Sequence, residues 1–442
     1  MSELVMQERK NIGEKIYELA CELFPINRSI TGQGVRETLR ILQRELSDLQ
    51  IHEVPSGTPC FDWSVPKEWN ICDAYIIGPD GKKIADFHEN NLHVVGYSTP
   101  VDKTVSLSEL KRHLYSIPEQ PDAIPYVTSY YEERWGFCIE DKKKALLKKG
   151  EYKVYIDSTL KHGSLTYGEI IIPGNSEKEV FLSTYICHPS MANNEVSGPV
   201  VTTFLGKWLQ GLRSRRYTYR IIFVPETIGS IAYISFNLEQ LKKHVIAGFN
   251  VTCVGDEKAY SFLPSRSGNT LADRVAIHVL KHVSPDFIRY SYLDRESDER
   301  QYCSPSVGLP VVSVMRSKYR EYPEYHTSKD DLNFISPEGL FGGYNSLKQC
   351  FICLERNETL CMSNPCEPQL GKRNLHPTLG ARDAYNSIKI VMGLIGYCDG
   401  TKDLLEIAER TGLRMQDLFE TVDKLKEEGL LLTEDNNWSD AG

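Results

Sequence analysis

The stretch FLSTYICHPSMANNEVSGPVV, from Phe181 to Val201, decides the fold. It opens with an apolar run rich in aromatic and β-branched residues, which is typical of a buried strand. It breaks at His188, passes two asparagines and Glu195, and continues in a second apolar run. In α/β sheets, ligands bind beyond the carboxyl ends of the strands, where strands give way to helices. We therefore expect this turn to carry part of a functional site.

Dense apolar runs of strand length alternate with helical patterns around and after this turn. The apolar runs cover residues 169–174, 179–187, 216–226, 245–255 and 309–317. The helical patterns cover residues 198–214, 230–244 and 270–283. Strands that alternate with helices form sheets with helices on both faces. The sequence therefore predicts an α/β fold with a mixed, largely parallel sheet flanked by helices.

The composition and the periodicity of the chain are different on both sides of this α/β pattern. Residues 8–50 have helical periodicity, whereas residues 52–168 are rich in proline, glycine and aromatic residues and contain the turn GPDGKK. We predict a β-rich unit of residues 52–168, with helical residues before it, an α/β region of residues 169–370 after it, and a C-terminal domain of residues 371–442.

The C-terminal domain has the spacing of a winged helix-turn-helix. Residues 383–435 hold three helical segments and end in an apolar run that suits a wing strand. The expected recognition helix, residues 414–428, has more acidic than basic residues, whereas a DNA-reading helix is expected to be basic. This favours contact with protein, or an architectural role, over binding of nucleic acid.

The composition is that of a globular protein. The 442 residues are 41% hydrophobic and 25% charged, with a net charge of −9, which argues against nonspecific binding to nucleic acid or anionic membranes. No apolar run approaches the roughly 20 residues of a membrane helix, and the N-terminal residues lack the apolar core of a signal peptide. We therefore expect a cytoplasmic protein with reduced cysteines and no membrane partner.

Four cysteines near residue 360 raise the question of a structural metal. Cys350 and Cys353 form a CxxC pair, followed by Cys361 and Cys366, so a zinc knuckle is conceivable. The residues from 347 to 360 have helical periodicity, however, and both CxxC cysteines can pack as small apolar residues. The helical interpretation is favoured.

Histidines and carboxylates recur after the predicted strands. His188 and Glu195 follow one strand, Glu226 and Asp256 follow the next two, and His326 follows the last. In a parallel sheet these residues share one edge, and two histidines with carboxylates suit Zn²⁺. A carboxylate left free beside the metal could take a proton from water. Each residue alone has a structural alternative, such as a satisfied histidine or an acidic residue at a helix start.

The order of these residues resembles that of the zinc aminopeptidase-like superfamily, the peptidases of clan MH. The stretches that carry the resemblance are NNEVSGP, PETIGSIAY, SDERQYCSPSVGLPVVSV and YHTSKDDLNFI, within His188 to Asp331. The family places a metal-binding histidine after one strand, then a bridging Asp, a Glu-Glu pair, a further Asp and a final histidine. The resemblance implies an aminopeptidase-like fold and a metal-dependent hydrolase.

The whole chain more closely resembles an uncharacterised group of bacterial aminopeptidase-like proteins. The phrases that carry this are ELFPINRSITGQGVRETL, CHPSMANNEVSGP, SDERQYCSP and YPEYHTSKDDL. That group has an inserted small β-rich domain and a C-terminal winged helix, and its members are often associated with polysaccharide biosynthesis. The resemblance implies a discontinuous α/β domain of residues 1–51 and 169–370, an inserted small β-rich domain of residues 52–168, and a winged-helix domain of residues 371–442.

The chain departs from the superfamily at three metal positions. The bridging Asp aligns with Asn194, although Glu195 could replace it if the turn is re-aimed. The second glutamate of the pair is Thr227, and the later Asp aligns near Thr252, four residues before Asp256. We therefore expect one zinc ion rather than two.

The resemblance then assigns roles to the remaining residues. The zinc would be held by His188, His326 and either Glu195 or Asp256, with Glu226 as the general base. The two asparagines before Glu195, Asn193 and Asn194, would support the ligands or donate to a substrate carbonyl.

Three further residues are candidates for substrate contacts. Asp298, beside Glu299, could receive a substrate amino group, or the two could form a surface pair with neighbouring arginines. Arg316 could bind a carboxylate or a sugar acid, and Tyr325 could shape the pocket beside His326. The segment SYYEERWGFC, residues 129–138, contributes either to the cleft or to a domain interface.

The leading functional hypothesis is a zinc-dependent hydrolase that cleaves an amide bond of a small peptide or of an amino-acid or sugar conjugate. The alternatives are an amidohydrolase of an amino-sugar conjugate, a catalytically inactive binding module that kept the peptidase fold, and a transcriptional regulator. The winged helix and the insertion also offer surfaces on which a homo-oligomer could form.

Overall fold

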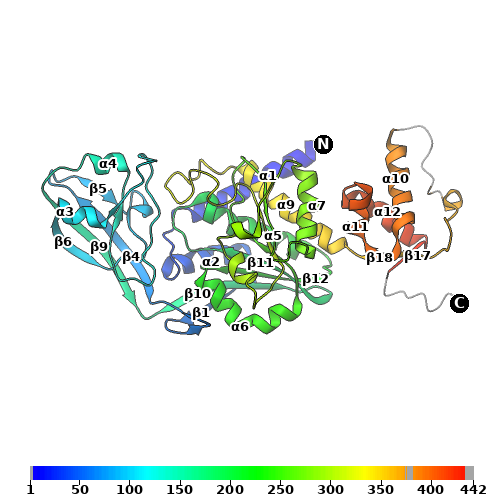
Figure 1. Cartoon of the computed structure of the whole chain (residues 1–442), viewed down its shortest axis with the longest axis horizontal. Coiled ribbons are helices and arrows are strands. Elements are labelled where there is room, and N and C mark those ends of the chain that lie inside the picture. The colour runs from blue at the N-terminus through cyan, green and yellow to red at the C-terminus, as the bar shows by residue number, and fades with distance from the viewer. Residues whose placement is uncertain (1–2, 374, 376–381, 434–442) are drawn as a thin grey trace. The chain divides into compact units, whose positions relative to one another are not determined.

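A computed structural model of the protein describes residues 3–373, 375 and 382–433 (Figure 1). It divides into two compact units. The first comprises Met1–Asp273 and Phe287–Asn345, and the second comprises Arg274–Asp286 and Ser346–Gly442. The candidate site lies in the first unit.

The first unit is built on an eight-stranded mixed sheet. The strands lie in the order β1 (Gln50–Pro55), β10 (Ser164–Ile172), β12 (Tyr217–Val224), β11 (Ser176–Tyr185), β13 (Val245–Asn250), β16 (Val311–Met315), β14 (Ser261–Leu263) and β15 (Ile288–Arg289). Strands β12, β11, β13 and β16 are mutually parallel, whereas β1 pairs antiparallel with β10, β10 with β12, and β14 with β16. The edge strand β15 pairs parallel with β14. This confirms the predicted mixed sheet with a parallel centre.

Helices cover this sheet. Helices α1 (Glu3–Leu23) and α2 (Gln33–Glu45) pack against α5 (Ser197–Gly211), which contacts β11 and β12. Helix α6 (Ile228–His244) contacts β10 and β11, and Figure 1 shows α5 above and α6 below the sheet. Helix α5 approaches the sheet closely at Gly198, where a Cβ atom would lie 2.5 Å from the carbonyl oxygen of Val251. The SG pair of the opening motif therefore lets this helix dock.

The insertion is β-rich, as predicted. Its antiparallel sheet has the order β5 (Lys83–Asp86), β4 (Glu68–Ile77), β9 (Glu151–Lys161) and β6 (Val101–Ser106), and the GPDGKK turn joins β4 to β5. The smaller elements are β2 (Pro59–Cys60), β3 (Trp63–Ser64), η1 (Asn91–His93), α3 (Leu107–Leu110), η2 (Lys111–His113), β7 (Leu114–Tyr115), β8 (Phe137–Cys138) and α4 (Asp141–Ala145). Trp69 and Tyr97 of the insertion share one apolar core with Phe181 and Tyr233 of the α/β part.

Short elements complete the first unit around the site. They are η3 (Ala192–Val196), η4 (Tyr292–Asp294), α8 (Glu299–Tyr302) and the start of α9 (Pro337–Arg356).

The second unit contains the predicted winged helix. Its elements are most of α7 (Leu271–Val283), the rest of α9, β17 (Thr359–Met362), η5 (Leu370–Arg373), α10 (Arg382–Tyr397), β18 (Asp399–Asp403), α11 (Leu404–Thr411), α12 (Met415–Glu427) and β19 (Leu431–Thr433). Helix α11 ends at Gly412, whose φ of 66° is the left-handed conformation that glycine adopts readily. Helix α12 matches the expected recognition helix, and β19 matches the expected wing strand.

Two details of the second unit bear on predictions made from the sequence. Cys350 and Cys353 are buried in α9, which confirms the helical interpretation of this segment. Strand β17 pairs with β18 and β19, so this small sheet begins before residue 371. The domain boundaries stay predictions, and residues 434–442 of the predicted C-terminal domain lie outside the described residues.

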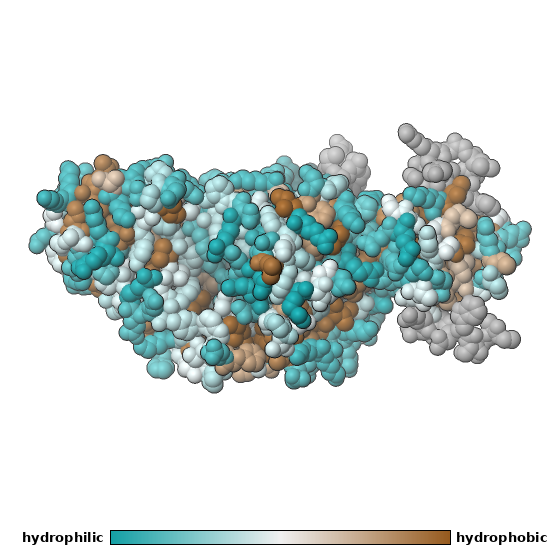
Figure 2. Space-filling view, in the orientation of Figure 1, coloured by the Kyte–Doolittle hydropathy of each residue, from teal (hydrophilic) through white to brown (hydrophobic). Residues whose placement is uncertain are grey.

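The face of the molecule seen in Figure 2 is mainly polar. Figure 2 shows hydrophilic residues over most of the face in view, with hydrophobic residues in small groups. Within the part of the chain that the structure describes, no helix has both the length and the apolar character that crossing a membrane requires.

Candidate metal centre and active site

A π-helical turn, η3, connects the loop after β11 to helix α5. All five of its residues are buried. A π turn accommodates one residue more than an α-helical turn and is frequent at functional sites. Here Glu195 is the residue that meets His188, whose Nδ1 lies 2.6 Å from Glu195 Oε2. The neighbouring Asn194 turns its amide to the Tyr185 hydroxyl instead, at 2.8 Å.

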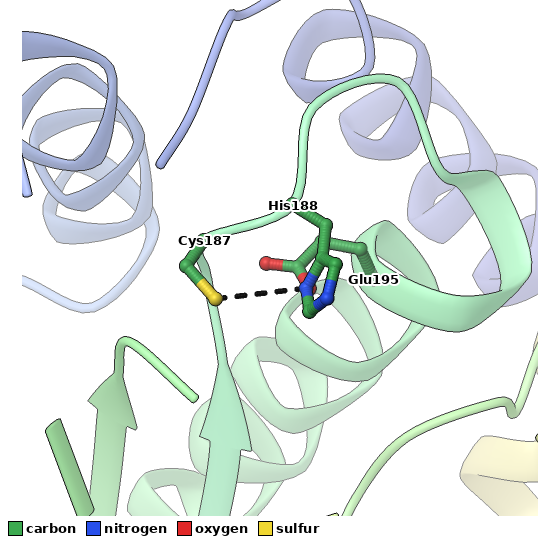
Figure 3. Close-up of side chains that lie close together, drawn as sticks. All are labelled: Cys187, His188 and Glu195. Atoms are coloured by element: carbon green, nitrogen blue, oxygen red, sulfur yellow. Dashed lines mark hydrogen bonds and ion pairs between the residues drawn. The ribbon is translucent and has the colours of Figure 1, made fainter. Parts of the chain in front are cut away.

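His188 and Glu195 form a cluster with Cys187. Their potential ligand atoms all lie within 4.8 Å of one another. Figure 3 shows Cys187 and His188 in the segment that follows the strand and Glu195 on the helical turn, with the Cys187 Sγ atom 3.5 Å from His188 Nδ1. The Oε1 atom of Glu195 is buried and has no hydrogen-bond partner. A buried carboxylate oxygen without a donor is suited to a cation.

Glu226 and His326 lie beside this cluster. The Glu226 Oε2 atom is 3.5 Å from His188 Nε2, and the imidazole ring centroids of His188 and His326 are 5.3 Å apart. The His326 Nε2 atom is also buried without a hydrogen-bond partner. The structure therefore brings together four of the site residues predicted from the sequence: His188, Glu195, Glu226 and His326.

Aromatic rings enclose the two histidines. Tyr325 stacks on His326 with ring centroids 3.9 Å apart. Tyr126, from the β-rich insertion, packs against both His188 and His326 at 5.0 and 5.1 Å, and its backbone N–H donates to the His326 carbonyl. The insertion thus forms part of the wall of the site.

The charges of the site set the protonation of its groups. Burial alone would lower the pKa of His188, but the charge of Glu195, its hydrogen bond and the charge of Glu226 raise that pKa above its ordinary value. Burial raises the pKa of Glu226. Burial and the charge of His188 lower the pKa of His326 well below its usual range, so this imidazole is neutral. Neutral imidazole is the form that binds a metal ion.

Unusual backbone conformations mark the loops of the site. Ser190, Thr227, Cys253 and His326 all have φ between +47° and +63°. This region is strained for residues other than glycine, above all for a β-branched residue such as Thr227. Such strain persists only where the surrounding contacts fix the loop, which is common at binding and catalytic sites.

Asp330 fixes the start of the π turn through hydrogen bonds to its backbone. Its Oδ1 and Oδ2 atoms accept the backbone N–H groups of Asn193 and Asn194 at 2.6 and 3.0 Å. Asp330 therefore holds the start of the turn that carries Glu195, although it lies more than 130 residues away in the sequence.

Asp256 has a different environment from the cluster. Its carboxylate accepts from the Asn193 amide at 3.0 Å, from the Lys258 backbone N–H at 2.8 Å, and from both the backbone N–H and the hydroxyl of Ser317 at 2.8 and 2.7 Å. The predicted ligand Asp256 is thus saturated with donors that tie three loops together.

Of the predicted substrate contacts, Asp298 lies beside Glu226. Its Oδ1 atom accepts from the Thr227 backbone N–H at 2.7 Å and from the Ser230 hydroxyl at 2.8 Å. Burial and the charge of Glu226 raise the pKa of Asp298 to about 8. Asp298 and Glu299 are both buried, so the alternative of a surface ion pair is wrong.

The other predicted contacts are placed as follows. Arg316 is buried, with its guanidinium 3.8 Å from the centre of the Tyr260 ring. In the segment 129–138, Tyr130 reaches the site through a 3.0 Å hydrogen bond between its hydroxyl and that of Tyr126, whereas Trp135 stacks on His113 within the insertion.

Three residues at this site were not predicted from the sequence: Arg28, Cys187 and Tyr126. The Arg28 Nε atom donates to the His188 carbonyl at 3.1 Å, and its Nη1 atom donates to the Leu23 carbonyl at 2.6 Å. The side chain is 2% exposed. A lone arginine in the polar segment INRSITGQG was the available signal, because a buried arginine there needs specific acceptors.

Comparisons with known proteins place the chain in a family. Residues 17–357 match the family described as a domain of unknown function, DUF4910, and residues 358–433 match a winged helix-turn-helix family. The chain is 44% identical over 422 residues to a protein of Clostridium acetobutylicum with the provisional name of polysaccharide biosynthesis protein with an aminopeptidase-like domain, covering 95% of this chain and 96% of the relative.

Solved structures agree on the fold. A provisionally assigned peptidase from Clostridium acetobutylicum has a TM-score of 0.91 at 43% identity, covering 97% of this chain and 98% of that one. A zinc aminopeptidase from Bacillus subtilis has a TM-score of 0.57 at 14% identity, covering 77% of this chain and 94% of that one. The protein therefore belongs to the DUF4910 family, with an aminopeptidase-like fold and a C-terminal winged helix.

Proposed function

We propose that the protein is a zinc-dependent hydrolase of the aminopeptidase type, which cleaves an amide bond in a small peptide or in an amino-acid or sugar conjugate. The observation that carries this proposal is the pair of buried, unpartnered ligand atoms, Glu195 Oε1 and His326 Nε2, around His188. Unpartnered polar atoms destabilise a fold unless a ligand satisfies them.

The donor set fits one zinc ion. His188, Glu195 and His326 would hold it, since two imidazoles and one carboxylate are a common set for catalytic zinc. The hydrogen bond between His188 and Glu195 keeps these two side chains together, so both would be available to the ion. Burial raises the pKa of the Cys187 thiol well above its usual range, so this neighbour is a protonated thiol.

Bound zinc would supply a Lewis acid that polarises a substrate carbonyl and makes water easier to deprotonate. The chain supplies a proton acceptor in Glu226, whose pKa burial raises toward the range useful for a general base. Asp298 orients this carboxylate by holding the Thr227 backbone N–H. Asn194, whose Oδ1 atom is buried without a partner, and Tyr325 are the proposed substrate contacts.

A second candidate function, a binding module without turnover, rests on two departures from the residues of the superfamily. Thr227 stands where the superfamily has a metal-binding glutamate, and Asn194 stands where it has a bridging Asp. A chain that lost turnover in this way would remain a binding module for the same class of ligand.

The test uses zinc-loaded protein and two substrate classes, aminoacyl 4-nitroanilides and N-acyl amino sugars. Turnover of either class that Glu226→Gln abolishes, with zinc still bound, supports the hydrolase. Binding of such compounds without turnover supports the binding module. Turnover that Glu226→Gln leaves intact contradicts the assignment of Glu226.

A further inference from the structure

The first unit contains a cavity that the proposed function does not use. Its volume is about 620 Å³. Sixteen residues from the start of the chain and from the β-rich insertion line it, among them Asn27, Gln33, Glu37, Ile41, Trp69 and Phe87. None of His188, Glu195, Glu226 or His326 is among the lining residues. The cavity is therefore distinct from the candidate metal centre.

The cavity is built around a tightly folded loop, residues 27–34. Gly32 has φ of 104°, and a Cβ atom there would collide with the backbone carbonyl of Trp69. A Cβ atom at Gly34 would collide with the carbonyl of Asn27. The two glycines let the loop curl against the insertion, and side chains at these positions would push the loop out of place.

The walls offer both donors and acceptors. Helix α2 begins at this cavity, and its N-cap Gly32 provides no side chain for the free N–H groups of the first turn. The Gln33 backbone N–H is taken by the Asn70 side chain at 2.7 Å. Asn27 adds an amide group, and Glu37 adds a carboxylate. The Asn91 NH₂ group already donates to the Pro25 carbonyl and to the Ser190 hydroxyl, each at 3.0 Å, so this side chain has only its amide oxygen left for a ligand. Such mixed polarity suits a ligand whose groups both donate and accept, as hydroxyl groups do.

The charge of the lining excludes an anion as the favoured ligand. Glu22 and Glu37 are the carboxylates of the wall, and it contains no lysine or arginine. Its one histidine, His88, lies with Nε2 3.3 Å from the Asp73 carboxylate. Glu22 already pairs with Arg44 at 2.6 Å, whereas the ion pairs among the described residues do not include Glu37. Phosphate and nucleotide sites are lined by positive groups, so a neutral ligand fits better.

The remaining wall is apolar. Trp69 and Phe87 lie in it together with Ile26, Ile41 and Ile71. Aromatic and aliphatic walls with a few directed polar groups are typical of small-molecule sites of roughly 300–1,000 Å³. A sugar ring matches this lining, because it has C–H faces for the apolar wall and hydroxyl groups for the amides and the carboxylate.

We propose that this cavity is a binding site for a neutral sugar unit, separate from the metal centre. The proposal does not depend on hydrolysis at His188. The loop that lines the site also contains Arg28, which holds the His188 carbonyl, so a ligand in the cavity would sit against the segment that positions that histidine.

The test is saturation-transfer NMR and calorimetry on the full chain, with N-acetylglucosamine and maltose as neutral probes and glucuronate as the anionic probe. Ile41→Trp fills the cavity from α2, and Arg40→Trp adds the same side chain at an exposed position of the same helix as a matched control. Asn27→Ala removes a polar group of the loop without adding bulk.

The expected result is binding of at least one neutral probe, weakened about tenfold or more by Ile41→Trp and by Asn27→Ala and unchanged by Arg40→Trp. Binding should persist in a His188→Ala, His326→Ala double variant, which separates this site from the metal centre. The proposal is overturned if neither neutral probe binds, if glucuronate binds more tightly than both, or if the cavity variants leave binding unchanged.

Discussion

Two neighbouring strand ends in the central sheet carry buried carboxylates with opposite environments. Strands β11 and β13 run parallel and adjacent, and Glu195 and Asp256 follow them. Each residue is 1% exposed. Glu195 has one oxygen against His188 and one without a partner, whereas Asp256 accepts four hydrogen bonds. A carboxylate at a strand end is therefore not necessarily free for a ligand, because the supply of local hydrogen-bond donors differs between these two neighbouring strand ends.

The largest expected effect is on metal binding by Glu195→Gln. The amide can accept from His188 with its oxygen and place its NH₂ group where Oε1 has no partner, so the free energy of unfolding of the metal-free protein should change by less than about 1 kcal/mol. Zinc affinity should fall about 100-fold or more. Competitive titration with a chromophoric chelator measures it, and an unchanged zinc affinity would remove Glu195 from the site.

Asp256→Asn makes the matched change at the other strand end. It should lower the stability of the fold and leave zinc affinity nearly unchanged. Both Asp256 oxygens accept two donors each, so neither orientation of the amide satisfies them and its NH₂ group must face other donors. We expect a loss of about 3 kcal/mol in the free energy of unfolding. Zinc affinity should stay within about threefold of the wild type.

Urea denaturation and the same zinc titration measure this pair of effects. A stable Asp256→Asn protein that no longer binds zinc would reverse the comparison and make Asp256 a ligand.

Asp298→Asn tests the buried carboxyl beside Glu226 through the pH dependence of stability. Its pKa is raised from 3.8 to about 8, mainly by burial. The folded protein therefore keeps a proton that the unfolded chain releases, and metal-free wild type should lose stability as pH rises from about 4 to about 8. The Asn variant lacks this titration, so its stability relative to that of the wild type should rise across that pH range. Urea denaturation between these pH values measures it, and parallel curves would contradict the raised pKa.

The smallest expected effect is that of Cys187→Ala. The thiol is protonated and accepts the Glu226 backbone N–H at 3.2 Å, which makes it a packing neighbour of the site. Zinc affinity should change by less than about threefold, because the sulfur atom is already occupied by the Glu226 backbone N–H. A loss comparable to that of Glu195→Gln would identify Cys187 as a ligand.

Much of the fold could be predicted from the sequence. The apolar runs before His188, Glu226 and Arg316 are strands of the central sheet, because dense β-branched runs of strand length have few other stable arrangements. The winged helix was readable from three helical segments and a short final strand. The boundary near residue 371 was harder to place, because β17 is short and its partners lie far along the chain.

Less of the site than of the fold could be predicted from the sequence. Order along the chain was enough to bring His188, Glu226 and His326 together, since the strands fix where their ends lie. It could not choose between Glu195 and Asp256, because that choice depends on the π turn and on donors such as Ser317 that are distant in sequence. Nor could it find Arg28 or Tyr126, whose roles arise from tertiary packing alone.

The central claim is that one zinc ion binds at His188, Glu195 and His326. The most direct test is metal content by plasma mass spectrometry on tag-free protein after zinc reconstitution, with the His188→Ala, His326→Ala double variant and Asp256→Asn beside the wild type. We predict about one zinc per chain in the wild type and in Asp256→Asn, and none in the double variant. Wild-type protein without zinc, or a double variant that retains it, would contradict the account.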